Sequence, residues 1–94
     1  MYSLKRASDG TGRTGELSLA IWVDETGVVR SEHDARPRIG VSMCVGSVSA
    51  LDSESFRIRA RRTSCVTTIV SRGVARVVFE TESGSRYVWQ IVTS

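Results

Sequence analysis

The chain has 94 residues, a formal net charge of +3 and a charged fraction of 24%. This length fits one small domain and is too short for a TIM barrel or a doubly wound nucleotide-binding sheet. The hydrophobic content of 40% argues against a disordered chain. No apolar run approaches the roughly 18 residues that cross a membrane, and the N-terminus lacks the apolar core of a signal peptide. We therefore expect a cytoplasmic protein that contacts no membrane.

The N-terminal stretch of residues 1–15 is polar and rich in glycine, with no apolar periodicity. We expect it to be a flexible arm that precedes a single β-barrel domain of residues 16–94. Gly10, Gly12 and Gly15 match the spacing of the dinucleotide-binding fingerprint. That fingerprint needs a preceding strand and a following helix, which the pattern does not provide. We therefore expect no cofactor.

From residue 16 onward, apolar and polar residues alternate with a period of two, which is typical of strands. The first predicted strand buries Leu17, Leu19, Ile21 and Val23 and places Trp22 on its other face. Further strands are predicted at residues 28–30, 39–51, 56–61, 65–70, 75–80 and 87–92. Charged or glycine-containing turns separate them, and no segment has the period of a helix.

This succession of short strands predicts an all-β domain, built as an antiparallel meander. Because barrel closure removes exposed strand edges, we expect the meander to close into a small SH3-like or OB-like barrel. A sandwich of two sheets is the alternative.

The sharpest feature of the sequence is the arginine series Arg57, Arg59 and Arg61, followed by Arg62. Alternate strand residues stand about 6–7 Å apart on one face, which suits a row of carboxylates or phosphates. The alternatives are an acidic protein partner, nucleic acid, or a solvated face that protects the strand from pairing. Trp22 either anchors a partner or packs beneath the N-terminal arm.

The residues that catalyse reactions or bind metals are scarce. His33 is the only histidine, it lies in a charged stretch, and no nucleophile motif accompanies it. Cys44 and Cys65 are isolated, which excludes a Cys/His zinc site and leaves either two free thiols or one disulfide. We therefore expect no catalytic residues, no metal and no enzymatic activity.

Three stretches resemble the small β-barrel accessory proteins of phages and prophages within residues 37–92. They are Pro37-Arg38-Ile39-Gly40-Val41-Ser42, then Val66-Thr67-Thr68-Ile69-Val70, and Val78-Phe79-Glu80-Thr81 with Tyr87 in the last strand. The resemblance implies an accessory protein of a mobile element in the cytoplasm of a bacterial host.

We therefore expect a non-enzymatic accessory factor, encoded by a phage, that docks through an arginine-lined face on a host protein with an acidic surface and modulates it. The predicted contacts are Arg57, Arg59, Arg61 and Arg62, with Trp22. The alternative is a nucleic-acid-binding barrel that uses the same arginines. Self-association through an uncovered strand edge is compatible with both.

Overall fold

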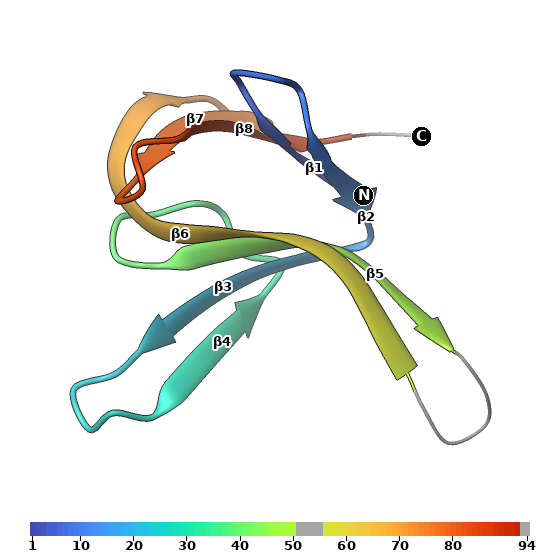
Figure 1. Cartoon of the computed structure of the whole chain (residues 1–94), viewed down its shortest axis with the longest axis vertical. Coiled ribbons are helices and arrows are strands. Elements are labelled where there is room, and N and C mark those ends of the chain that lie inside the picture. Colours follow the sequence, from blue (N-terminus) through green and yellow to red (C-terminus); the bar gives the residue numbers. More distant parts are fainter. Residues whose placement is uncertain (51–55, 93–94) are drawn as a thin grey trace.

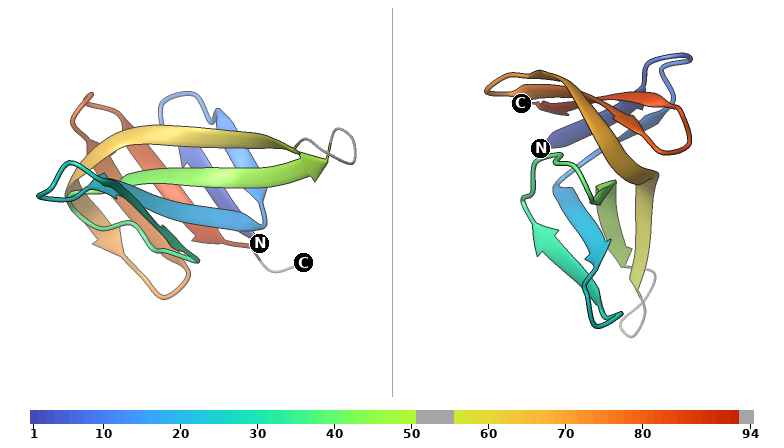
Figure 2. Two further views of the ribbon diagram at one scale, coloured as in Figure 1. Left: turned by 90° about the horizontal axis from the view of Figure 1, so that it is seen from below. Right: turned by 90° about the vertical axis from the view of Figure 1, so that its left-hand side faces the viewer.

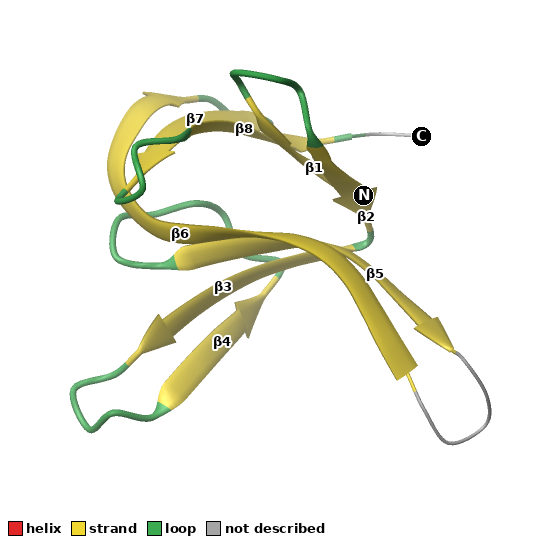
Figure 3. Cartoon of the chain, in the orientation of Figure 1, coloured by secondary structure: helices red, strands yellow, loops and turns green. Residues whose placement is uncertain are grey.

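The computed structural model describes the backbone of residues 1–50 and 56–92 and the side chains of residues 1–47 and 61–92. Eight strands and no helix are formed within these ranges (Figure 3), so no described segment is a helix that could span a membrane. The strands are β1 (Tyr2–Arg6), β2 (Gly12–Gly15), β3 (Leu17–Val23), β4 (Val29–His33), β5 (Ser42–Ala50), β6 (Phe56–Arg72), β7 (Arg76–Thr81) and β8 (Arg86–Ile91).

All neighbouring strands pair antiparallel in the order β2-β1-β8-β7-β6-β5-β3-β4. The predicted all-β antiparallel class is therefore confirmed. The meander is regular only from β5 to β8, because β5 pairs with β3 and the last strand pairs with the first.

The long strand β6 joins two halves of the sheet (Figure 1). Its first part pairs with β5 and its last part with β7, with register shifts beyond Val66 and Ile69. The two strands predicted at residues 56–61 and 65–70 are thus one strand. The halves face each other as two layers (Figure 2), and the largest buried side chains between them include Leu4, Met43 and Trp89.

Among the described residues the pairing does not close into a barrel, because β2 and β4 end the strand order. The β2 end nevertheless lies against β5. A Cβ atom at Gly15 would stand 2.1 Å from the carbonyl oxygen of Gly46, so only glycine allows this approach. The sheet is therefore rolled, with β2 against β5 and β4 at the other end.

The predicted flexible arm at residues 1–15 is wrong, because β1 and β2 form a hairpin there. β1 also pairs with β8 over its whole length, and the side chain of Leu4 is fully buried. The residues of this stretch are mostly polar, so the sequence gives no sign that it is ordered. One buried leucine and pairing with a strand at the far end of the chain are enough to order it.

The predicted faces of β3 are also reversed. Ser18 and Ala20 are buried, whereas Val23 on the supposed core face is 64% exposed and Ile21 is half-buried. The small side chains on the inner face leave room for the indole of Trp89, which hydrogen-bonds to the hydroxyl of Ser18. The buried polar group is thus satisfied, and the apolar stripe of β3 lies on the outside.

Candidate binding site

The segment of residues 34–41, which joins β4 to β5, crosses the space between the two layers and is held by hydrogen bonds from three strands. The Trp89 indole Nε1–H donates to Ser18 Oγ at 2.9 Å, and Ser18 Oγ–H donates to the carbonyl of Ala35 at 2.8 Å. The Ala35 N–H returns a bond to the Ser18 carbonyl at 3.1 Å. The Tyr2 hydroxyl donates to Asp34 Oδ1 at 3.0 Å. The pKa of Tyr2 is raised, chiefly by burial and to a smaller extent by this bond.

Arg36 lies within this segment and bridges the two layers. Its guanidinium stacks on the Trp89 ring at 5.4 Å from the centroid. Its Nη1–H donates to the carbonyl of Gly73 at 3.1 Å, in the turn between β6 and β7. The cation is therefore held in place by a ring and a carbonyl, and neither of these neutralises its charge.

Arg38 is held in a different way. Its guanidinium stacks on Trp22 at 5.0 Å and donates to Glu32 Oε2 at 2.8 Å. Its charge is therefore balanced by a carboxylate on β4. Trp22 is half-buried and packs against the core, with the guanidinium of this arginine over its ring.

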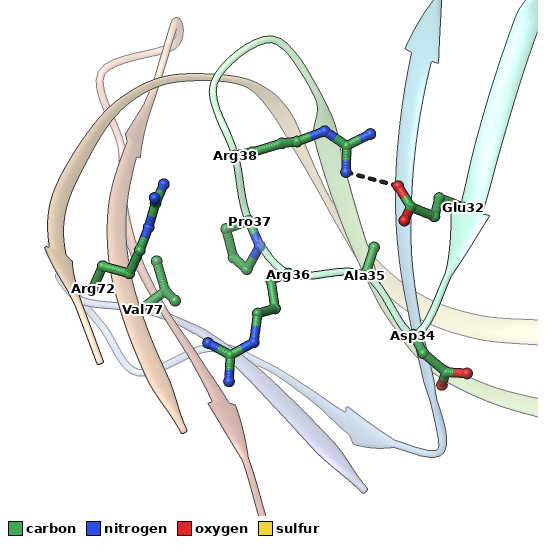
Figure 4. A pocket seen from close by; sticks show the side chains of 8 residues that line it. All are labelled: Glu32, Asp34, Ala35, Arg36, Pro37, Arg38, Arg72 and Val77. Atoms are coloured by element: carbon green, nitrogen blue, oxygen red, sulfur yellow. Dashed lines mark hydrogen bonds and ion pairs between the residues drawn. The ribbon is translucent and has the colours of Figure 1, made fainter. Parts of the chain in front are cut away.

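A depression with a volume of about 410 Å³ lies along this segment (Figure 4). In the close-up, Arg36 and Arg72 lie to one side of it, and the paired Arg38 and Glu32 lie to the other. The lining residues are Glu32, Asp34, Ala35, Arg36, Pro37, Arg38, Arg72 and Val77.

The charges in this depression are unevenly compensated. The ion pairs among the described residues join Arg6 to Asp9, Arg30 to Asp24, Arg38 to Glu32, and Arg86 to Glu80. Arg36 and Arg72 belong to none of these pairs. Two guanidinium groups thus border one depression without a described carboxylate partner, which is an arrangement that accepts an external carboxylate or phosphate.

The predicted arginine series on β6 is placed as follows. Arg57 and Arg59 lie in β6 opposite Ser49 and Ser47, and their side chains are outside the described residues. Arg61 does not project freely into solvent, because its guanidinium lies 5.8 Å from the Tyr87 ring centroid. Its Nη2–H also donates to the Tyr87 hydroxyl at 3.4 Å.

Arg62 is exposed and meets Trp22 at a second, smaller depression of about 210 Å³. Val23 and Val29, which are 64% and 66% exposed, also border it. Two of the predicted contact residues, Arg62 and Trp22, are therefore brought together. Of the apolar side chains beside them, Val23 was predicted to lie in the core, and Val29 was assigned to neither face.

Arg36 and Arg72 were not predicted as site residues. They lie 36 positions apart, and only the folded chain brings them to one depression. The available signal was the sequence Arg36-Pro37-Arg38, in which a rigid proline stands between two cations.

The cysteines and acidic residues offer no described metal site. No cluster of three or more histidine, cysteine, aspartate or glutamate side chains is present in the described part of the chain. Cys44 and Cys65 are free thiols. Burial raises the pKa of Cys44, opposed by the nearby charge of Arg62, so this thiol stays protonated near neutral pH.

Comparisons with known protein families, with curated proteins and with solved structures find no match for this chain.

Proposed function

We propose that this protein is a non-enzymatic binding module that captures an acidic segment of a partner protein. The observation that carries the proposal is the pair Arg36 and Arg72, two arginines that border one depression outside every described ion pair. A carboxylate of the partner supplies the missing countercharge and accepts bidentate hydrogen bonds from a guanidinium.

The fixed position of Arg36 favours such binding. Stacking on Trp89 and the hydrogen bond to Gly73 restrict its side chain before any partner arrives. Pro37 limits the backbone beside it. Less conformational entropy is therefore lost when a partner binds than for a mobile surface arginine.

The surroundings of the depression favour a protein over nucleic acid. Glu32 and Asp34 line it together with the arginines, and their charges oppose a continuous phosphate backbone more than a single carboxylate placed at Arg36 and Arg72. Ala35 and Val77 provide apolar contacts. The aromatic side chains among the described residues are buried or half-buried, so they do not form the stacking platforms of single-strand binders.

The proposal extends to the other predicted contacts. Arg62 and Trp22 border a second depression, and Arg57 and Arg59 are proposed to extend the basic surface along β6. We further propose that the rolled sheet is an incomplete barrel of the SH3-like or OB-like type. The resemblance to phage accessory proteins makes a protein of the bacterial host the proposed partner.

The proposal is tested by affinity capture from a nuclease-treated bacterial lysate, with three forms of the protein as bait. The test variant is Arg36→Glu/Arg72→Glu. The control is Arg6→Glu/Arg86→Glu, which changes the net charge equally but alters arginines that already have acidic partners.

We expect a saturable protein partner that binds the wild type and the control and loses at least about tenfold in affinity for the test variant. The proposal fails if no saturable protein is captured, or if both variants lose it equally. Capture from a parallel untreated lysate that disappears on nuclease treatment would replace it with the nucleic-acid alternative.

A further inference from the structure

The strand β4 is an end strand with an uncovered edge. It pairs with β3 alone, and all five of its residues are exposed. The other end strand, β2, lies against β5 at Gly15 and Gly46. β4 is therefore the end at which the sheet can be extended by another strand.

The hydrogen-bond phase of the β3–β4 hairpin determines which backbone groups of β4 point outward. The Asp24 N–H donates to the Val28 carbonyl at 2.9 Å, and the Val28 N–H donates to the Asp24 carboxylate at 3.0 Å. The first bond places these two residues at a hydrogen-bonded position of the ladder. Antiparallel pairs alternate, so Arg30 and Glu32 bond to β3. The N–H and C=O groups of Ser31, and of the residues two before and two after it, point away from β3.

The charges on β4 match a second copy of the same strand. Arg30 and Glu32 flank Ser31 and lie on the same face of the strand. An antiparallel pair centred on Ser31 places Arg30 of each copy opposite Glu32 of the other, twice by symmetry. We propose that β4 pairs in this register with β4 of a second copy, forming a homodimer with one continuous sheet across the interface.

The existing ion pairs extend this complementarity. Within each copy, Asp24 already binds Arg30 and Glu32 already binds Arg38. In the dimer the charges run Asp24, Arg30, then Glu32 and Arg38 of the second copy, so neighbouring charges in the row have opposite signs. Edge charges usually prevent strand pairing, but here their order favours pairing with an identical strand.

The opposite face of the strand brings Val29 into the interface. Val29 is 66% exposed and lies opposite Val23 in the register of the hairpin. In the proposed pairing it also meets His33 of the second copy. The interface shares Glu32 and Arg38 with the lining of the depression but uses neither Arg36 nor Arg72. Because those two arginines carry the proposed partner binding, failure of the dimer would leave that proposal intact.

The test is sedimentation velocity over a concentration series up to about 1 mM, because so short an interface is expected to bind weakly. Ser31→Pro removes an outward N–H that the β3–β4 pairing does not use. Ser31→Ala is the matched control, since it keeps that N–H. We expect a wild-type dimer that Ser31→Ala preserves and that Ser31→Pro weakens at least about tenfold.

A second measurement keeps the proposal testable if Ser31→Pro does not fold. Arg30→Glu and Glu32→Arg each place like charges opposite each other and are expected to be monomeric alone. Their mixture restores opposite charges at both contacts and is expected to form a heterodimer. A monomeric wild type, a dimer unaffected by Ser31→Pro, or a mixture that stays monomeric would each overturn the proposal.

Discussion

The substitution Ser18→Ala tests the hydrogen-bond chain that holds the 34–41 segment in place. Ser18 is 1% exposed, and its hydroxyl accepts a bond from Trp89 and donates one to the carbonyl of Ala35. Alanine removes both bonds without adding volume. It leaves the Trp89 indole N–H, on a residue with 0% exposure, without its partner.

The expected loss follows from these two bonds. About 1 kcal/mol for the lost bond from Ser18 to Ala35 and a penalty of about 1–3 kcal/mol for the unpaired buried indole donor give a destabilisation of roughly 2–4 kcal/mol. A domain of this length has a total stability of about 5–14 kcal/mol. The loss is therefore a large fraction of the total and lowers Tm by about 10 °C or more.

The assay is urea denaturation followed by tryptophan fluorescence, with Ser64→Ala as the control. Ser64 also hydrogen-bonds through its hydroxyl, but to Ser83 at an exposed position, and its removal is expected to cost less than about 0.5 kcal/mol. In a double-mutant cycle, Trp89→Phe with Ser18→Ala should cost less than the sum of the single changes, because no indole N–H is left unpaired. A Ser18→Ala variant as stable as Ser64→Ala would refute the reasoning.

Three further outcomes are expected. Leu4→Ala should lower the free energy of unfolding by about 2–5 kcal/mol in denaturant titrations, because this side chain of β1 lies in the core. An unchanged free energy of unfolding would support a flexible arm at residues 1–15 instead. Gly15→Ala should cost about 1–3 kcal/mol or more, since its Cβ meets the Gly46 carbonyl, and an unchanged midpoint would contradict that contact. Hydrogen bonds from Thr26, Arg30 and Val28 lower the pKa of Asp24 to about 2. The stability advantage of the wild type over Asp24→Asn should therefore be present above about pH 4 and vanish as the pH falls through about 2. A stability difference that does not depend on pH would exclude this linkage.

The class of the fold was predictable from local periodicity, because strand alternation is visible within a few residues. The inner face of β3 was not, since Ser18 is buried only because Trp89, 71 positions away, satisfies its hydroxyl. The β1–β2 hairpin was missed for a similar reason, as its partner β8 lies at the other end of the chain. Local pattern thus predicts strands, but not which distant residue completes a buried polar contact.

The candidate site could be predicted from the sequence only in part. The sequence directed attention to arginines, and Arg62 and Trp22 do share a depression, but their role in binding stays a prediction. Arg61 instead packs on Tyr87, which strand alternation alone does not reveal. Arg36 and Arg72 border one depression only because tertiary hydrogen bonds fix the path of the connecting segment that carries Arg36.

The most direct test of the central claim observes the arginine Nε–Hε groups by NMR during titration with a short oligoglutamate peptide. We predict that the resonances of Arg36 and Arg72 shift saturably, while those of the ion-paired Arg6 and Arg86 move little. Shifts of equal size at all four arginines, or none at Arg36 and Arg72, would contradict the account.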